Sequence, residues 1–296
     1  MSVRRWIPVF IEIDRVGKRY SISSGETIEA IAEVSLSVSE GEFVAILGPS
    51  GCGKSTLLKI VAGLIPASTG VVRVGGNVVN GPTKDVGIVF QNPVLLKWRR
   101  VLDNVLLPVE FLGLDRRRYE PVARELLRSV GLAGFEDRYP SQLSGGMQQR
   151  VAISRALIHD PKLLLMDEPF GALDELTRER MNFMLQDIWQ NRRKTVLFVT
   201  HSITEALFLS DRIVVMTGRP SRVARVVPVC LPRPRTSEMR AWEPFTRTLL
   251  EIQRQLYSAA SDGKDLDGPP EEEVGPSAIP TSGLSGVSDV RQVLPQ

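Results

Sequence analysis

Cysteine and histidine are scarce in this 296-residue chain, which contains two of each. Cys52 and Cys230 lie far apart and offer neither a disulfide framework nor the ligand spacing of a metal site. No apolar run approaches the roughly 18 to 20 residues needed to cross a bilayer, and Met1–Asp14 lacks the apolar core of a secretory signal. We therefore expect a cytosolic protein without redox-active thiols, which associates with a membrane only through a partner.

The remaining composition is that of an ordinary globular protein, with 43% hydrophobic and 24% charged residues. Its length allows one large domain, or one domain with an appendage. The net charge of +3 is unevenly distributed, because residues 262–296 carry −5 and residues 1–261 carry +8. A basic body could face nucleic acid, anionic head groups or only solvent, so charge does not decide among these. The tail is rich in Gly, Pro, Ser and Glu, and we expect it to be disordered.

Three short apolar runs predict strands that are buried on both faces: Phe43–Leu47, Leu163–Met166 and Val196–Val199. Helical periodicity follows the first run over Ser55–Ala62. Alternating apolar residues at positions 7–13, and a strand-rich segment at 28–38, precede it. Strands separated by helices indicate an α/β fold with a largely parallel sheet, whose functional loops lie at the strand ends.

Two further segments have helical patterns. The chain between Pro93 and Pro140 is mostly helical, and we interpret it as an inserted helical subdomain. Residues 238–260 place four apolar side chains on one face, which is typical of a helix that docks on a core. These are Phe245, Leu249, Ile252 and Leu256.

The strongest motif is a glycine followed by four residues and then Gly-Lys-Ser, directly after a predicted buried strand and before a predicted helix. This pattern and its context are those of a phosphate-binding loop, whose glycines let backbone N–H groups face a phosphate. Lys54 then contacts the β- and γ-phosphates, and the Ser55 hydroxyl is a magnesium ligand. The loop consists of Gly48, Pro49, Ser50, Gly51, Cys52, Gly53, Lys54, Ser55 and Thr56.

An acidic pair, Asp167 and Glu168, ends the buried run that begins at Leu163. In a parallel sheet this position lies beside the phosphate loop. Asp167 can hold magnesium, and Glu168 can act as the general base for the attacking water. The alternative, a simple cap at a strand end, is less compatible with four buried aliphatic residues and a phosphate loop upstream.

A second anion site is predicted at Ser144, Gly145 and Gly146, which open a helix that runs to about Ile158. One nucleotide seldom needs two such sites in one copy of a fold. We therefore expect this loop to close on ATP that is held by another copy of the protein.

The order of these motifs resembles that of ABC-transporter ATP-binding subunits over about residues 7–235, and the Leu-Ser-Gly-Gly sequence at 143–146 is highly specific to ABC ATPases. The resemblance implies a P-loop NTPase (RecA-like) core with a mainly parallel sheet, an antiparallel β subdomain and an inserted helical subdomain. It divides the chain into an ATPase domain at 1–235, with the helical subdomain at about 92–150, a helical extension at 236–260 and the acidic tail at 261–296. ATP and Mg²⁺ are the implied cofactors.

Single residues also acquire roles from this resemblance. Gln91 resembles the glutamine that touches magnesium and water and couples to transmembrane subunits. His201 resembles the histidine that contacts the γ-phosphate, whereas His159 matches no role. Asp174 resembles an aspartate at the dimer interface, although a helix N-cap explains it almost as well. Tyr20 resembles the aromatic residue that stacks on adenine, with a packed strand-end tyrosine as the alternative.

Residues 95–105 and 231–235 are similar to those of nitrate, sulfonate and taurine importers, except that Lys97 stands where many members have proline. This similarity implies a peripheral protein on the cytoplasmic face of the cell membrane. Its expected partners are a second copy of itself, transmembrane permease subunits and, indirectly, an extracytoplasmic solute-binding protein, with no nucleic acid. The alternatives are a soluble ABC ATPase acting on DNA or ribosomes, which usually has tandem units, zinc-binding cysteines or coiled coils, and an exporter ATPase, which is often fused to membrane helices.

Overall fold

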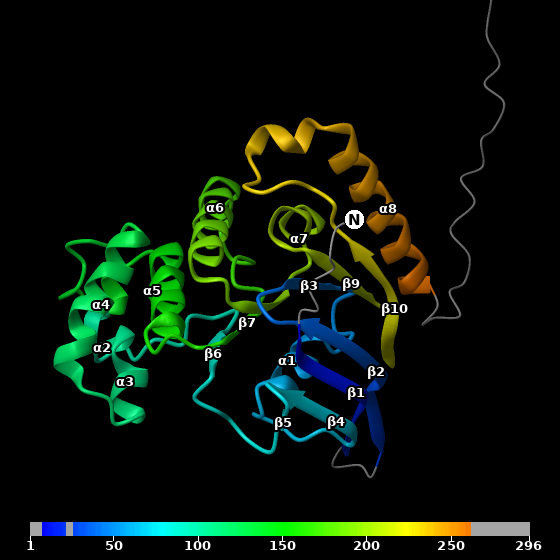
Figure 1. Ribbon diagram of the computed structural model, residues 1–296, viewed down its shortest axis with the longest axis horizontal. Coiled ribbons are helices and arrows are strands. Elements are labelled where there is room, and N and C mark those ends of the chain that lie inside the picture. Colours follow the sequence, from blue (N-terminus) through cyan, green and yellow to red (C-terminus); the bar gives the residue numbers. More distant parts are fainter. Residues whose placement is uncertain (1–7, 22–25, 262–296) are drawn as a thin grey trace, which may run out of the picture. The chain divides into compact units, whose positions relative to one another are not determined.

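The computed structural model describes residues 8–21 and 26–261 (Figure 1). Its strands within these ranges form one sheet in the order β5-β4-β1-β2-β10-β9-β3-β8-β7-β6. The bounds are β1 Val9–Ser21, β2 Thr27–Ser39, β3 Phe43–Leu47, β4 Thr69–Val74, β5 Asn77–Val78, β6 Val86–Val89, β7 Leu163–Asp167, β8 Thr195–Val199, β9 Arg212–Met216 and β10 Ser221–Pro228.

One half of the sheet is parallel, with β9, β3, β8, β7 and β6 side by side. Every residue of β3, β7 and β8 is buried, as their continuous apolar runs predict. Because parallel strands end at the same edge of a sheet, the segments that follow β3, β6, β7 and β8 meet there. These segments contain the phosphate loop, Gln91, Glu168 and His201.

The other half is antiparallel and consists of β1, β2, β4 and β5. Strand β10 joins the two halves, because it runs antiparallel to β9 and parallel to β2. The predicted fold class is therefore confirmed, with the antiparallel part continuous with the parallel part.

The helices from α1 to α7 fall into two groups. Helix α1 (Lys54–Val61) follows the phosphate loop, and α6 (Glu175–Arg192) and α7 (Ile203–Leu209) follow β7 and β8. Figure 1 shows α2 to α5 gathered beside β6 and β7, away from the antiparallel strands. Their bounds are α2 Val101–Val105, α3 Leu107–Phe111, α4 Arg116–Ser129 and α5 Gly145–Leu157, with a 3₁₀ helix at Pro140–Gln142. The division of the chain into domains remains a prediction.

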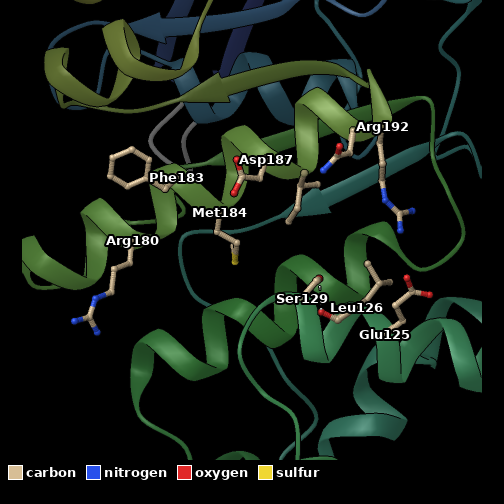
Figure 2. A pocket seen from close by; sticks show the side chains of 10 residues that line it. Glu125, Leu126, Ser129, Arg180, Phe183, Met184, Asp187 and Arg192 are labelled. Atoms are coloured by element: carbon tan, nitrogen blue, oxygen red, sulfur yellow. Dashed lines mark hydrogen bonds between the residues drawn. The ribbon is translucent and has the colours of Figure 1, made fainter. Parts of the chain in front are cut away.

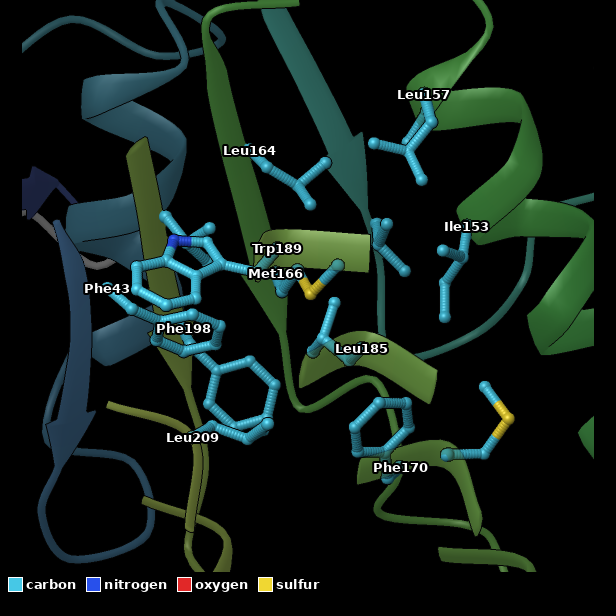
Figure 3. Close-up of a cluster of buried hydrophobic side chains, with 14 of the residues drawn as sticks. Phe43, Ile153, Leu157, Leu164, Met166, Phe170, Leu185, Trp189, Phe198 and Leu209 are labelled. Carbon is cyan, nitrogen blue, oxygen red and sulfur yellow. The ribbon is translucent and has the colours of Figure 1, made fainter. Parts of the chain in front are cut away.

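Alternate residues of the parallel strands face two separate cores. Val44 and Ile46 pack with α1 and the antiparallel strands, whereas Phe43 packs with residues of α5, α6 and α7. In Figure 3, Phe43 lies against Trp189 of α6 and Phe198 of β8, with ring centroids 6.1 and 5.8 Å away. Burial of such side chains on both faces holds the loops at the strand ends in place.

The C-terminal helix begins later than predicted. A 3₁₀ helix covers Ser237–Ala241, and α8 covers Glu243–Ser261. Pro244 explains the start, because proline lacks an N–H group and suits the first turn of a helix. The predicted face does dock, with Phe245 and Ile252 at 3% and 0% exposure. The predicted disordered tail lies outside the described residues, except for Ser261.

Two arginines after β10 fix the end of α7. Arg235 is 2% exposed and donates to the carbonyl oxygens of Leu207 and Ser210, both at 2.7 Å. Arg233 stacks 4.1 Å over the Trp189 ring. Burial lowers the pKa of Arg235 to about 9, so its guanidinium remains protonated at neutral pH. These cations satisfy carbonyl groups that the helix end leaves open and position the helix that begins two residues after His201.

None of the described helices is long and apolar enough to cross a membrane.

Candidate functional site

The phosphate loop connects the buried end of β3 to the first turn of α1. Gly51 and Gly53 adopt positive φ values of 73° and 102°, which glycine tolerates without strain. A Cβ atom on Gly53 would also lie only 3.1 Å from the carbonyl oxygen of Ala30. The conformation therefore requires glycine at these positions, and it leaves the N-terminus of α1 directed at the loop.

Lys54 lies inside the loop. Its side chain is 5% exposed, and its ammonium group donates to the carbonyl oxygens of Gly48 and Pro49 at 2.8 and 2.9 Å. Its third contact is the sulfur of Cys52 at 4.0 Å. A buried cation whose recorded hydrogen-bond partners are all neutral groups is well suited to a polyanion that enters the loop.

A cavity of about 480 Å³ opens over this loop. Tyr20 stands at its rim with 41% of its surface exposed and pairs across the β1–β2 register with Ile28. The Lys18 ammonium lies 5.1 Å from the centroid of the Tyr20 ring, and stacking of this ring on adenine remains a prediction. The lining residues are Tyr20, Ile28, Ala30, Ser50, Gly51, Gly53, Lys54, Ser55, Thr56, Gln91, Glu168 and Arg219.

Ser55, which lines this cavity, contacts Asp167 at the end of β7. The Ser55 hydroxyl donates to Oδ1 of Asp167 at 2.8 Å. Burial raises the pKa of Asp167, and the Ser55 hydrogen bond opposes that shift. The described residues contain no group of three or more His, Cys, Asp or Glu side chains able to hold a metal. One carboxylate beside one hydroxyl nevertheless fits Mg²⁺, which takes most of its remaining ligands from water and substrate phosphates.

Glu168 and His201 face each other next to this pair. Oε2 of Glu168 lies 3.1 Å from Nδ1 of His201. The backbone of Glu168 has a positive φ of 44°, uncommon for a residue with a side chain and typical of functional sites. Its N–H group donates to the carbonyl oxygen of Val199 at 2.8 Å, which holds this conformation. The structure thus brings a carboxylate, an imidazole and the phosphate loop to one strand edge.

The predicted second anion site is separate from this cavity. Ser144 caps α5, with its hydroxyl accepting from the N–H of Met147 at 3.3 Å, and it is absent from the cavity lining. A Cβ atom on Gly145 would meet nothing within 4 Å, whereas one on Gly146 would lie 3.1 Å from Cγ2 of Thr177. Packing therefore explains Gly146, but nothing within this copy requires glycine at 145.

Asp174 is the N-cap of α6. Its carboxylate accepts from the N–H of Thr177 at 2.9 Å, and this bond lowers the pKa of Asp174. The capping role named as an alternative is therefore present in the structure. A role at a dimer interface remains a prediction.

Three side chains that motif recognition missed hold the loops of the site. Gln149 of α5 donates to the carbonyl oxygen of Phe90, next to Gln91, at 3.2 Å. Arg155, also of α5, donates to the carbonyl oxygens of Pro93 and Val94, both at 2.8 Å. Arg219 contacts the phosphate loop itself. Gln149 lies three residues after the Leu-Ser-Gly-Gly sequence at 143–146, but no sequence pattern indicates the contacts of the two arginines.

Cys52 lies in the phosphate loop, and its reactivity can be predicted from its surroundings. It is buried, whereas Cys230 is exposed. Burial raises the pKa of the Cys52 thiol, an effect that nearby Lys54 only partly offsets. A raised pKa leaves less reactive thiolate at any given pH. We expect iodoacetamide at pH 7.5 to alkylate Cys230 first, as measured by peptide mass spectrometry. Equal labelling of the two thiols would contradict this account.

Among the cavities away from the phosphate loop, two adjoin the helical segment at 101–157. One, of about 670 Å³, separates α4 from α6. In Figure 2, Glu125 and Leu126 of α4 face Met184 and Asp187 of α6 across it. It contains none of the predicted site residues, and its two acidic and two arginine side chains balance.

The second cavity is an apolar groove of about 500 Å³ between β6, α3 and α5. Phe111 and Val94, which both line it, are 82% and 60% exposed. His159 also lines this groove, and burial lowers the pKa of its imidazole. Several large apolar side chains exposed together are typical of a surface that a partner covers.

Comparisons with known proteins give the family of the chain. The ABC transporter family profile matches residues 31–171. An uncharacterized ABC transporter ATP-binding protein of Methanocaldococcus jannaschii is 46% identical over 244 residues, which cover 82% of this chain and 91% of that protein. A taurine import ATP-binding protein of Rhizobium johnstonii is 49% identical over 213 residues, 72% of this chain and 81% of that protein.

An aliphatic sulfonates import ATP-binding protein of Bacillus cereus is 40% identical over 241 residues, 81% of this chain and 94% of that protein. Among solved structures, a dimeric ATP-binding cassette in a post-hydrolysis state, bound to ADP and phosphate, has a TM-score of 0.67. It is 35% identical and covers 75% of this chain and 100% of its own.

Proposed function

This chain belongs to the family of ABC transporter ATP-binding proteins, which are ATPases, and from that premise we propose that it energises the import of a small anion or organic solute. Relatives named for taurine and sulfonate import support this solute class. The observation that carries the residue assignments is one cavity whose wall combines the phosphate loop, Gln91 and Glu168.

In this proposal Tyr20 stacks on the adenine and the phosphate loop holds the phosphates. The carboxylate of Asp167 and the hydroxyl of Ser55, with Gln91 beside them, are the groups that would hold Mg²⁺. When bound, Mg²⁺ neutralises charge on the β- and γ-phosphates. Lys54 exchanges its two carbonyl partners for phosphate oxygens, which are stronger acceptors.

Glu168 is the proposed general base. It accepts a proton from water as the water oxygen attacks the γ-phosphorus, and the bond from that phosphorus to the bridging oxygen of ADP breaks. His201, 3.1 Å from the Glu168 carboxylate, orients that carboxylate and contacts the γ-phosphate. The fold leaves little freedom at Glu168, because its backbone N–H group is bound to β8.

Ser144 and Gly145 complete the site of a second copy. The open space at Gly145, at the N-terminus of α5, leaves room for a phosphate that this copy does not hold. Two ATP molecules then lie between two copies, each bound by the phosphate loop of one and the α5 N-terminus of the other. The two copies close on ATP and reopen after hydrolysis, which couples ATP hydrolysis to a conformational change.

The apolar groove between β6, α3 and α5 is the proposed permease contact. It adjoins the segment 90–94 that α5 holds through Gln149 and Arg155, so a change at Gln91 reaches it directly. A permease helix in this groove would place the chain at the cytoplasmic face of the membrane. The solute would be delivered by a separate solute-binding protein and would not touch this chain.

Phe111→Asp tests the groove. A carboxylate there loses its hydration when a partner covers it, so we expect membrane-bound protein to fall about tenfold. The ATPase rate of the purified chain should stay within about twofold, because Phe111 lies outside the cavity over the phosphate loop. Leu250→Asp on α8, which also places a charge at an exposed apolar position, is the matched control. Unchanged membrane recovery of Phe111→Asp would contradict the assignment.

Purification of the full chain from detergent-solubilised membranes tests the importer proposal as a whole. Recovery with a transmembrane subunit is expected. Recovery with nucleic acid and without any membrane subunit would favour an ATPase that acts on DNA or ribosomes.

A further inference from the structure

The turn between β9 and β10 reaches the cavity over the phosphate loop. Arg219 lies between β9 and β10, 168 positions after Gly51 of the phosphate loop. Its Nη2 and Nε atoms donate to the carbonyl oxygen of Gly51 at 2.8 and 3.2 Å. The guanidinium also lines the cavity over the loop. Within the described ranges, no ion pair to a carboxylate is recorded for it.

This contact acts on the part of the loop where orientation matters most. Gly51 has a φ of 73°, which few other residues would adopt. A phosphate is bound by N–H groups that point inward, so the neighbouring carbonyl oxygens must point away from it. Two donors from one guanidinium fix the Gly51 carbonyl in direction, and their positive charge stays beside the bound polyanion.

The turn that carries Arg219 is itself anchored. The N–H of Gly218 donates to the carbonyl oxygen of Ala259 in α8 at 3.0 Å. Two bonds close the turn: the Thr217 hydroxyl accepts from the N–H of Arg222 at 2.9 Å, and the N–H of Thr217 donates to the Arg222 carbonyl oxygen at 3.0 Å. On the other side, the Ser221 hydroxyl donates to the carbonyl oxygen of Ala30 at 3.3 Å. A continuous chain of contacts therefore runs from the C-terminal helix to the phosphate loop.

We propose that Arg219 is a positioning residue that sets nucleotide affinity by holding Gly51, and that α8 supports it through the turn at 217–220. The proposal rests on the assignment of the phosphate loop as the nucleotide site. It gives α8 a role beyond covering the core, because a displacement of the last turn of α8 would move the turn at 217–220 and with it the contact between Arg219 and the Gly51 carbonyl.

The test compares Arg219→Met, Arg219→Lys and Arg222→Met in the full chain. Isothermal titration calorimetry gives the Kd for ATP and ADP, and steady-state kinetics give kcat at saturating MgATP. We expect Arg219→Met to raise both Kd values about tenfold, with kcat changed less than about twofold. Arg219→Lys should recover part of the loss, because it keeps the charge and one donor.

Arg222→Met removes the same charge from the same region, and its Kd should match that of the unaltered protein. If Arg222→Met weakens nucleotide binding as much as Arg219→Met does, the loss of positive charge alone explains the result and the proposal is wrong. Unchanged Kd values in Arg219→Met also overturn it, as does a fall in kcat without a change in Kd. Lys54→Ala separates the two levels, because normal ATP binding by that variant would remove the nucleotide-site assignment itself.

Thr217→Val tests the support of the turn without altering any residue that lines the cavity. It removes one of the two bonds between Thr217 and Arg222 and keeps the backbone bond, so the turn is weakened and the Kd should rise by about threefold. Equal affinity of Thr217→Val and the unaltered protein would overturn the part assigned to the turn.

Discussion

Replacing Glu168 by glutamine lowers the rate of ATP hydrolysis by about 10²- to 10⁴-fold while ATP binding is retained. Glutamine keeps the size of the side chain and can still bond to His201, so the fold of the β7–α6 connection should survive. It cannot accept the proton of the attacking water. Single-turnover phosphate release measures the rate of the chemical step, and equilibrium binding of ATP measures whether nucleotide affinity is retained.

The same variant should accumulate as an ATP-bound dimer, because the step that reopens it is blocked. Size-exclusion chromatography with and without ATP detects this shift. Glu175→Gln is a matched control, since Glu175 lies in the first turn of α6 and its side chain is 71% exposed. Its turnover should be normal. Undiminished turnover in Glu168→Gln would remove Glu168 from the role of base.

Replacing Gly145 by aspartate lowers the rate of ATP hydrolysis by at least about 100-fold, while each copy still binds ATP at its own phosphate loop. The side chain fits within one copy, because a Cβ atom at Gly145 meets nothing within 4 Å. An acidic residue in the first turn even favours the helix. The carboxylate repels only a phosphate that arrives at this N-terminus from another copy.

Gly81→Asp is the control for this prediction, because a Cβ atom at Gly81 also meets nothing within 4 Å. It adds the same charge away from α5 and should leave turnover within about twofold. Normal turnover in Gly145→Asp would show that the α5 N-terminus does not take part in hydrolysis.

Much of the core could be predicted because local patterns and buried strands coincide. The apolar runs of β3, β7 and β8 have no other stable location than the middle of a sheet, and their order places Lys54, Asp167 and His201 at one edge. The helix start at Ser144 was also predictable, since serine before two glycines is a good N-cap. Local sequence determines these features, so no tertiary information was needed.

Long-range contacts were not predictable in this way. Nothing in the sequence around Arg219 indicates Gly51, because the two meet only through the position of β10 between β9 and β2. The burial of Arg235 under α7 depends likewise on packing. The apolar groove is formed by β6, α3 and α5 together, and no single periodic segment reveals it. The later start of α8 could have been predicted from Pro244, which favours the first turn of a helix. The prediction followed the amphipathic pattern instead and placed the start at residue 238.

The central claim is that each ATP site is shared between two copies, and mixing two inactive variants tests it directly. Lys54→Ala lacks a working phosphate loop and Gly145→Asp lacks a working α5 N-terminus, so each alone should be inactive. In a mixed dimer, the intact phosphate loop of one variant faces the intact α5 N-terminus of the other. Random pairing should therefore restore on the order of a quarter of the normal ATPase rate. No recovery on mixing, with dimers shown to exchange, would contradict the shared site.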